Sequence, residues 1–377
     1  AAAEELAGQL RADAAERDRE NQPPVCEIDL LRKSGLLGVA PDDHLTGHAV
    51  TRIIAAADAS IGHLFGYHYL NVWRFGLFDT AEPAARLWRE TAEQQWFWAA
   101  VSNPGDVLQA HPADDGGLLI NGRRAFATGA AVADRLIVNA TRADTGARLT
   151  LAVDARAPGI SNPADWDNIG QRLTASGSVA FDDVHVDTTD VAGSLPPEGD
   201  DPRLTRLSLS ALAYQSVLTQ VYVGIAQGAL ADAADYTRDR ARPWLLSGVD
   251  SAAEDPYILA GYGELVAAVQ AAGLLADHAA AALQWASDRG PALTAEQRGE
   301  TGVTISAAKV AATKVVNETT ARIFEFIGAR GTATRFGFDH YWRNARTLTL
   351  HDPVAYKARE VGAHFLTGEL PPFTSYS

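Results

Sequence analysis

The sequence has a single cysteine, Cys26, and no methionine among its 377 residues. One thiol cannot form an intrachain disulfide, so nothing in the chain requires an oxidising compartment. Basic residues are also few, because 32 Lys and Arg stand against 47 Asp and Glu, which gives a formal net charge of −15. Such a surface repels a polyanion overall, and this argues against nucleic acid as a partner.

Long apolar runs are absent as well. No stretch approaches the roughly 20 consecutive apolar residues that a membrane-spanning helix needs. Residues 1–22 are charged and helix-prone, unlike a signal peptide. These absences predict a cytoplasmic protein that does not enter a membrane.

Three zones follow one another along the chain and predict an α+β protein. With 47% hydrophobic residues the chain can bury a sizeable core, and its length allows about two or three domains. Residues 1–95 are helical in character, residues 96–195 are rich in strand patterns, and residues 196–377 return to helical patterns. We therefore expect an N-terminal helical domain, a central β-barrel-like domain and a C-terminal four-helix bundle.

The strand signals lie in the middle zone. Two runs rich in apolar residues, at 135–141 and 147–155, flank a short turn sequence. The dipeptide Asn121-Gly122 is typical of a hairpin turn. Between residues 179 and 186 the alternation slips at Asp182-Asp183, which predicts a β-bulge.

The third zone carries long helical patterns in which apolar residues recur three or four positions apart. Gly224 and Gly228, four apart in a predicted helix of residues 206–240, would allow another helix to pack closely. The recurring residues are Ile258, Tyr262, Leu265 and Val269 in one helix, and Ile305, Ala308, Ala312, Val315, Thr319, Ile323 and Phe326 in the next.

Two pairs of histidines are candidate metal ligands. His63 and His68 are five residues apart, a spacing that does not place two ligands on one helix face. His44 and His48 have helical i, i+4 spacing, but no carboxylate-bearing helix accompanies them, and chance is the better interpretation. We predict no metal site.

Several long strings resemble the acyl-CoA dehydrogenase superfamily. They include IAAADASIGHLFGYHYLN, DWDNIGQRLTASGSVAFDDVHV and the terminal PPFTS. Within the superfamily they resemble the flavin-dependent monooxygenases typified by the dibenzothiophene monooxygenase of bacterial desulfurisation. The resemblance runs from about residue 5 to the end, with interruptions near 40–48, where a Gly-rich loop is expected, and near 102–108. It implies an acyl-CoA dehydrogenase-like fold.

The resemblance also implies a two-component monooxygenase. Such an enzyme uses reduced FMN and O2 to form a C4a-hydroperoxyflavin, which oxygenates a small apolar substrate containing sulfur, nitrogen or an aromatic ring. No G-x-G-x-x-G motif follows a strand here, so a separate NADH-dependent reductase would supply the reduced flavin. FMN is expected from the resemblance, and the residues themselves leave FAD open.

The segment HDPV, residues 351–354, bears on the type of chemistry. In many acyl-CoA dehydrogenases this segment supplies a glutamate that removes a proton next to the thioester. Here Asp352 is one carbon shorter than glutamate and directly precedes Pro353, so we expect that base to be absent. His351 is then the polar group expected to face the flavin.

The resemblance assigns further residues to the site. His63 and Tyr67 match residues on the substrate side, where histidine can donate a proton near neutral pH and tyrosine adds a hydroxyl to an apolar face. Phe126 and Thr128 match the strand that touches the flavin ring, and the Thr128 hydroxyl can hydrogen-bond there. Trp166 matches a tryptophan that covers the flavin. Without the resemblance, His63 and Tyr67 would be interpreted as ordinary buried or interfacial residues, and Trp166 as a core residue.

Arg242 and Arg330 match arginines that hold the flavin phosphate. A guanidinium group offers a planar fork suited to phosphate oxygens, and surface salt bridges are the ordinary alternative. In this superfamily the phosphate is held across a subunit boundary, which implies an oligomer, commonly a homotetramer.

Two departures from the dibenzothiophene enzyme make the expected pocket more apolar. Ala100 stands where that enzyme has an asparagine, and Leu348 stands where it has a second histidine. Both changes argue against dibenzothiophene itself as the substrate. Two alternative functions stay open at this point: an acyl-CoA dehydrogenase or oxidase with a displaced base, and a catalytically inactive flavin-binding homologue.

Overall fold

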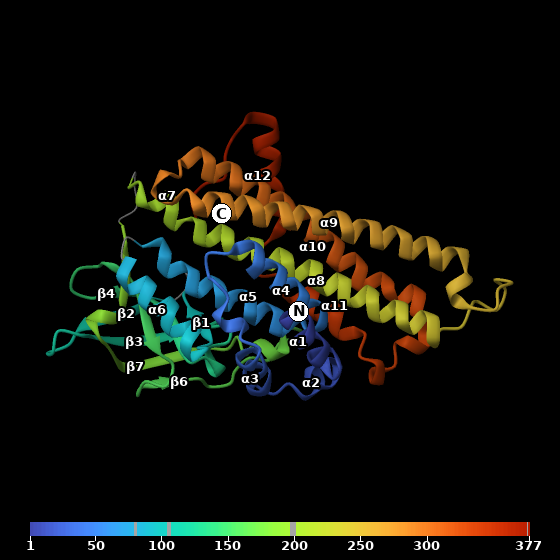
Figure 1. Ribbon diagram of the computed structural model, residues 1–377, viewed down its shortest axis with the longest axis horizontal. Helices are drawn as coiled ribbons and strands as arrows, with labels where there is room; N and C mark the ends of the chain where they lie inside the picture. The colour runs from blue at the N-terminus through green and yellow to red at the C-terminus, as the bar shows by residue number, and fades with distance from the viewer. Residues whose placement is uncertain (79–80, 104–106, 197–200, 375) are drawn as a thin grey trace.

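The computed structural model describes residues 1–78, 81–103, 107–196, 201–374 and 376–377. Helices come first, then strands, then helices again, in the order expected from the three zones (Figure 1). The N-terminal helices are α1 (Ala2–Arg11), α2 (Ala14–Glu20), α3 (Val25–Lys33), α4 (His44–Ala57), α5 (Ala59–Arg74) and α6 (Ala81–Gln94). The C-terminal helices are α7 (Arg203–Leu207), α8 (Leu209–Asp239), α9 (Pro256–Asp288), α10 (Ala295–Gly331), α11 (Asp339–Leu348) and α12 (Val354–Thr367).

The strands form one sheet that curls into a half-barrel over its own apolar core, which includes Val101, Ile120 and Val138. Their order is β6-β7-β3-β2-β4-β5-β8, and β1 pairs with β4. The strands are β1 (Trp98–Val101), β2 (Leu108–Pro112), β3 (Leu118–Arg124), β4 (Arg135–Arg142), β5 (Arg148–Asp154), β6 (Ile160–Ser161), β7 (Val179–Val186) and β8 (Val191–Leu195). The two predicted strands at 135–141 and 147–155 are confirmed as β4 and β5.

One predicted turn is wrong, and the bulge beside it is confirmed. Asn121-Gly122 does not close a hairpin, because β3 runs straight through it. Opposite, Ile120 pairs with Val184 and Gly122 pairs with Phe181, so two residues of β7 face one residue of β3. The Asn121 amide donates to Oδ1 of Asp183 at 2.8 Å and its carbonyl oxygen accepts from the Asp183 N–H at 3.0 Å. The dipeptide therefore serves the bulge, and Gly122 has a φ of +124°.

The interruption expected near 40–48 covers the turn before α4 and the first residues of that helix, which begins at His44 after the capping residue Asp43. In the interruption expected near 102–108, residues 104–106 lie outside the described residues.

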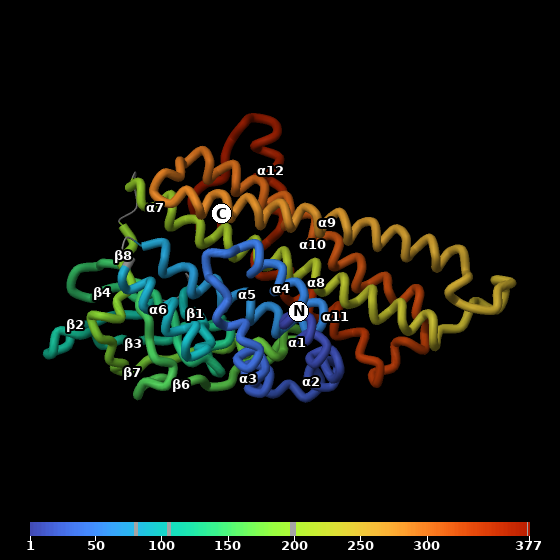
Figure 2. Tube along the Cα trace, in the orientation of Figure 1, coloured from blue at the N-terminus to red at the C-terminus, as the bar shows by residue number. Residues whose placement is uncertain are grey.

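The C-terminal bundle and the N-terminal helices share one core. Leu6 of α1, Phe65 of α5, Leu212 of α8 and Ile305 of α10 belong to the same buried apolar cluster. Figure 2 shows α4 and α5 lying between the sheet and the long helices. This layering brings α5 into contact with both the sheet and α8, and it positions the site described below.

Close packing of α8 against α4 confirms the role expected for its glycines. A Cβ atom at Gly224 would lie 2.7 Å from the carbonyl oxygen of Arg52, and one at Gly228 would lie 2.1 Å from that of Ala56. Both distances are shorter than a side chain tolerates, so only glycine fits at these two positions.

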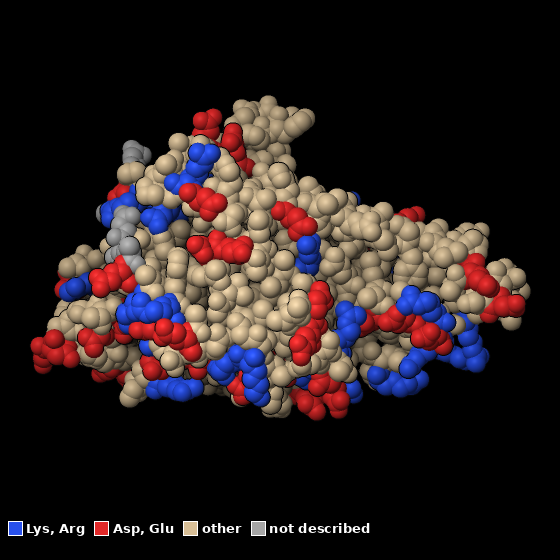
Figure 3. Space-filling model, viewed as in Figure 1, with Lys and Arg blue, Asp and Glu red and all other residues tan. Residues whose placement is uncertain are grey.

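Two helical segments, Arg203–Asp239 and Pro256–Asp288, are long and apolar enough to cross a membrane by length and composition alone. In the first segment, which joins α7 and α8, 83% of the most apolar 18-residue stretch is buried. In the second segment, α9, the corresponding share is 28%, and Tyr257, Leu259 and Leu274 are exposed. Charged side chains are sparse along α9 in the space-filling view (Figure 3). This apolar face of α9 is unoccupied in a single chain.

Candidate active site

Helix α5 contributes two aromatic rings to one side of the site. His63 and Tyr67 are four residues apart, so they lie on the same helix face, and their rings are perpendicular with centroids 4.3 Å apart. The helix begins at a firm cap, because the Asp58 carboxylate accepts from the backbone N–H groups of Ser60 and Ile61. The same carboxylate pairs with Arg17 of α2 at 2.7 Å. These contacts fix where α5 begins and therefore where both rings point.

His63 is a buried, neutral histidine. Its Nδ1 lies 3.1 Å from Oε1 of Gln171, while its Nε2 is buried without a hydrogen-bond partner among the described residues. Burial lowers the pKa of His63 to about 3, although the bond to Gln171 opposes the shift. Near neutral pH this imidazole offers a hydrogen bond and not a positive charge.

Tyr67 meets His351 across the site. The Tyr67 hydroxyl lies 3.4 Å from Nε2 of His351, a long hydrogen bond, and the Tyr67 ring packs edge-on against Tyr214 of α8 with centroids 4.9 Å apart. Burial raises the pKa of Tyr67 well above its ordinary value, and Tyr214 adds to the shift. The hydroxyl therefore keeps its proton and can donate it in a hydrogen bond.

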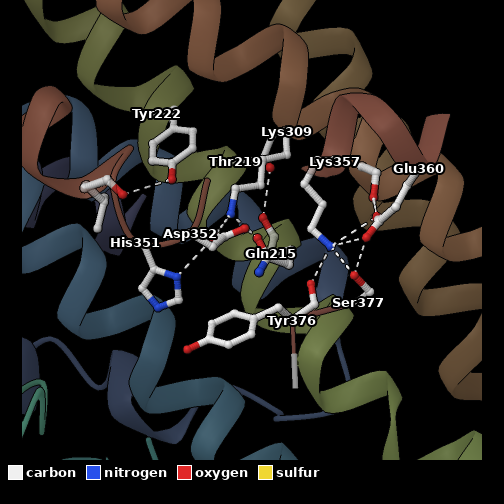
Figure 4. Close-up of polar contacts among 12 residues, drawn as sticks. Gln215, Thr219, Tyr222, Lys309, His351, Asp352, Lys357, Glu360, Tyr376 and Ser377 are labelled. Carbon is white, nitrogen blue, oxygen red and sulfur yellow. Dashed lines mark hydrogen bonds and ion pairs between the residues drawn. The ribbon is translucent and has the colours of Figure 1, made fainter. Parts of the chain in front are cut away.

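Asp352 faces away from this side and into a buried ion pair. Its carboxylate pairs with Lys309 of α10, which also contacts Gln215 of α8 (Figure 4). Oδ1 of Asp352 additionally lies 3.1 Å from Nδ1 of His351. Burial alone would raise the pKa of Asp352, but the His351 hydrogen bond and the Lys309 charge hold it well below its ordinary value. A carboxylate held this way is a poor proton-abstracting base, which agrees with the expectation for this position.

Thr128 lies beside the sheet, and its hydroxyl hydrogen has no acceptor within the part of the chain that the structure describes. It lies in the loop after β3, which is fastened by hydrogen bonds from the N–H of Ala127 to the oxygen of Gly177 and from the N–H of Gly129 to the oxygen of Thr174. Ser176 donates to Thr128 Oγ1 at 2.9 Å. The proton of Thr128 is therefore left to donate to a bound group.

Phe126 and Trp166 form an aromatic pair near this loop. Their ring centroids are 6.3 Å apart and the rings are nearly perpendicular, at 80°. Phe126 is 65% exposed and its φ is +57°, a left-handed conformation uncommon outside glycine. An exposed aromatic ring held in such a conformation suits contact with a flat ligand.

Gln171 was not predicted, yet it connects most of the site. Its side chain holds His63, and its carbonyl oxygen accepts from Trp166 Nε1 at 2.8 Å. Its backbone N–H donates to Oδ1 of Asn344 on α11 at 2.5 Å. Nothing in a single sequence distinguishes this glutamine, because two of its three partners, His63 and Asn344, come from distant segments.

The structure does not bring Arg242 and Arg330 to this cluster. Both are exposed, one in the connection after α8 and the other in the last turn of α10. The connection between α8 and α9 lies at the end of the bundle far from the sheet (Figure 1). Within one chain, neither guanidinium group is placed beside Phe126 or Trp166.

The two departures occupy apolar surroundings. Leu348 is 4% exposed and belongs to a buried cluster against which Tyr67 packs, and its carbonyl oxygen accepts from the Tyr222 hydroxyl at 3.2 Å. Ala100, on β1, is half-buried beside another apolar cluster. Neither position supplies a side-chain donor.

A cavity of about 510 Å³ opens on the other side of His351. It is bounded by α12 and by the C-terminal segment, including Leu370 and Tyr376. His351 and Asp352 line it while Tyr67 and Thr128 do not, so the cavity meets the cluster around His63 at His351.

The cluster fits a flat heteroaromatic ring with a polar edge. Phe126 and Trp166 supply aromatic surface, and Thr128 supplies a donor. Nε2 of His63 and the side-chain nitrogen of Gln171 are buried polar atoms without partners among the described residues, and a polar ligand would satisfy them. The isoalloxazine ring of a flavin has this character.

The family profile described as "Acyl-CoA dehydrogenase, C-terminal domain" matches residues 216–356. The dibenzothiophene monooxygenase of Rhodococcus erythropolis is 41% identical over 398 aligned residues, covering 100% of this chain and 95% of that protein. A probable FMNH2-dependent monooxygenase, SfnC of Pseudomonas putida, is 38% identical, with 100% and 97% covered. TdsC from Paenibacillus sp. A11-2, solved as a complex with FMN and indole, superposes with a TM-score of 0.92 at 40% identity, covering 100% of this chain and 99% of that one.

Proposed function

Because this chain belongs to the dibenzothiophene monooxygenase family and is an FMN-dependent monooxygenase, we propose that His351, Tyr67, His63 and Thr128 are its catalytic residues. The observation that carries this proposal is the position of Asp352. Its carboxylate is paired with Lys309, and the imidazole of His351 points instead toward Tyr67.

The cofactor-binding residues follow from the aromatic pair and the loop after β3. We assign Phe126, Trp166 and Thr128 to flavin binding: the two aromatic side chains would pack against the isoalloxazine ring, and the Thr128 hydroxyl would donate a hydrogen bond to it. When bound, reduced FMN supplies the activated oxygen that is transferred to the substrate. The protein positions that ring, and the packing of Tyr67 and Leu348 limits access of water.

The proton-handling group is His351. Its Nδ1 donates to Asp352, so its Nε2 is the nitrogen that can take up or deliver a proton on the Tyr67 side. His63, with its low pKa, acts as a neutral hydrogen-bonding partner. Tyr67 donates a hydrogen bond without losing its proton.

The substrate is proposed to be a small molecule that contains a sulfur or nitrogen atom or an aromatic ring. The name of the Rhodococcus relative and the TdsC complex point to dibenzothiophene and indole for those proteins. In this chain Leu348 and Ala100 give an apolar wall with few donors, which favours substrates held by shape over substrates held by hydrogen bonds.

Arg242 and Arg330 are assigned to the flavin phosphate of a neighbouring subunit. Their distance from the ring site within one chain is the reason for placing them across a boundary. The exposed apolar face of α9, with Leu259 and Leu274, supports a homotetramer in which this face is covered. We also propose that a separate NADH-dependent flavin reductase supplies the reduced FMN and that the protein is cytoplasmic.

The test supplies the purified chain with FMN, NADH, a flavin reductase and ¹⁸O2, and offers a thioether, indole or dibenzothiophene. Incorporation of one ¹⁸O atom into any of these products supports the proposal. An acyl-CoA oxidised anaerobically by the same preparation would instead support a dehydrogenase. Flavin binding with hydrogen peroxide as the sole product would point to an inactive homologue.

A further inference from the structure

Lys309 is a buried cation that the proposed reaction does not use directly. It lies on α10, its side chain is 1% exposed, and its ammonium group contacts the carboxylate of Asp352 and the side-chain oxygen of Gln215. Burying an ion pair costs desolvation energy, and a well-packed apolar pair is often at least as stable. Stability alone therefore gives a weak reason for a lysine at this position.

The geometry gives a second reason. A single oxygen, Oδ1 of Asp352, meets both Lys309 and Nδ1 of His351 (Figure 4). His351 itself lies in the connection between α11 and α12 and its side chain is 35% exposed. Among the described residues, the other polar contact of the imidazole is the long one to Tyr67, so Asp352 is the stronger restraint on the direction of the ring.

We propose that Lys309 is a positioning residue, which acts through Asp352 to fix the ring orientation and the Nδ1–H tautomer of His351. The Asp352 carboxylate accepts one hydrogen bond from Lys309 and one from Nδ1–H of His351. Because it stays ionised, the proton remains on Nδ1. Nε2 is then left free on the Tyr67 side. This inference rests on the proposed role of His351.

A neighbouring pair of the same chemistry offers a matched control. Lys357 of α12 is 2% exposed and pairs with Glu360 at 3.1 Å, and it also donates to the carbonyl oxygen of Tyr376 and to Ser377 Oγ. Neither Lys357 nor Glu360 has a hydrogen bond or ion pair to His351 among the described residues. Neutralising this second pair removes a buried ion pair and leaves Asp352 in place.

The experiment reads the tautomer directly in flavin-free protein. Magic-angle-spinning ¹⁵N spectra of protein labelled only at histidine separate protonated from unprotonated ring nitrogens, and H351Q identifies the His351 signals. At pH 7.5 we expect protonated Nδ1 and unprotonated Nε2 in the wild type. In K309M the unpaired Asp352 takes His351 as its counter-ion, so Nε2 becomes protonated. In the neutral double variant K309M/D352N the second tautomer appears.

Activity supplies the second reading. In both Lys309 variants we expect roughly tenfold to hundredfold less oxygenated product, with more hydrogen peroxide released per NADH, because a mispositioned imidazole loses its acid–base contribution. The control K357M/E360Q should leave the His351 signals unchanged. The double variant keeps the test valid if K309M fails to fold, because it buries no unpaired charge.

Unchanged His351 signals in the folded variants would overturn the proposal and leave Lys309 as a tie between α10 and the α11–α12 connection. The outcomes for the proposed function are separate. If the wild type oxygenates nothing while the His351 signals shift as expected, the monooxygenase assignment fails and the positioning role of Lys309 stands.

Discussion

Tyr67 and His351 lie 284 residues apart in the sequence, and the hydroxyl of one approaches Nε2 of the other to 3.4 Å. One residue comes from α5 and the other from the connection between α11 and α12. The shared core of the two helical zones makes this meeting possible, because α5 packs against α8 and α8 packs against α11. The site is therefore a product of the fold as a whole and not of a local motif.

Replacing the imidazole tests the central role. We expect His351→Gln to lower the rate of product formation by about a hundredfold, since general acid–base groups typically contribute 10²–10⁴-fold. Oxygen consumption should continue, with hydrogen peroxide replacing product. Product and peroxide measured against NADH consumed give this ratio. The control is His111→Gln, the same change at an exposed histidine of β2, and an equal loss there would contradict the assignment.

The Tyr67 hydroxyl is expected to matter less than the imidazole. Tyr67→Phe keeps the ring that packs on His63 and Tyr214, and it removes one hydrogen bond worth about 1 kcal/mol, or roughly fivefold in rate. The turnover number should fall by about that factor while the affinity for FMN, measured by fluorescence quenching, stays unchanged. Tyr262→Phe, which removes a hydroxyl bonded to Thr237 within the bundle, serves as control. Loss of FMN binding in Tyr67→Phe alone would assign the residue to the cofactor instead.

The spacing of apolar residues predicted the helices well, and in α10 it also indicates a buried charged residue. Lys309 is four residues after Ile305 and three before Ala312, so it falls on the buried stripe of α10. A lysine in that position requires a buried acceptor. The sequence could not say which, because Asp352 is 43 residues away and reaches Lys309 only through the packing of the bundle.

Local chemistry also left ambiguities that only pairing resolves. The sequence predicts a hairpin turn at Asn121-Gly122 because glycine permits a positive φ. A glycine opposite a β-bulge can also have a positive φ. Whether a turn or a bulge forms depends on pairing with β7, about 60 residues further along. Gln171 shows the other limit, since its partners Asn344 and His63 lie far from it on both sides of the sequence.

Buried histidines predict a strong loss of stability in acid. Burial lowers the pKa of His48 and His68 to about 4 and that of His63 to about 3, from an ordinary value of 6.5. The unfolded chain therefore binds more protons than the folded one once the pH falls below 6.5. The free energy of unfolding should be highest above pH 6.5 and decrease by up to about 1.4 kcal/mol per pH unit for each such histidine as the pH falls toward 4.

Urea unfolding midpoints between pH 7.5 and 4.5 measure this dependence. His68 is the clearest case, because its Nδ1 accepts from the Trp98 N–H and its Nε2 donates to the Leu37 oxygen, an arrangement open only to the neutral ring. His68→Gln should reduce the slope by about one proton. The exposed His111→Gln should leave the slope as it is, and equal slopes in all three proteins would refute the explanation.

If Arg242 holds the flavin phosphate, replacing it should weaken FMN binding without disturbing the structure around it. Arg242→Gln should weaken FMN binding by about tenfold, since a hydrogen bond to a charged group is worth about 1.5–3 kcal/mol. Calorimetric titration with FMN and with riboflavin, which lacks the phosphate, shows whether the lost contact is to the phosphate or to the ring. Only FMN binding should fall. Arg156→Gln, an exposed arginine beside the sheet, is the control, and an equal loss of riboflavin binding in Arg242→Gln would count against a phosphate contact.

Close helix packing makes the last prediction, which concerns stability alone. In Gly228→Ala the new Cβ would lie 2.1 Å from the carbonyl oxygen of Ala56, so α8 and α4 must separate. Overpacking of this kind costs typically about 1–3 kcal/mol, and the backbone oxygen cannot turn aside as a flexible side chain could. Gly8→Ala in α1 is the matched control, because nothing lies within 4 Å of its added Cβ. There the better helix propensity of alanine should raise the free energy of unfolding by about 0.5–1 kcal/mol. The urea unfolding midpoints of the two variants should therefore shift in opposite directions. A shift of the same sign in both would show that α8 does not approach α4 as closely as this packing requires.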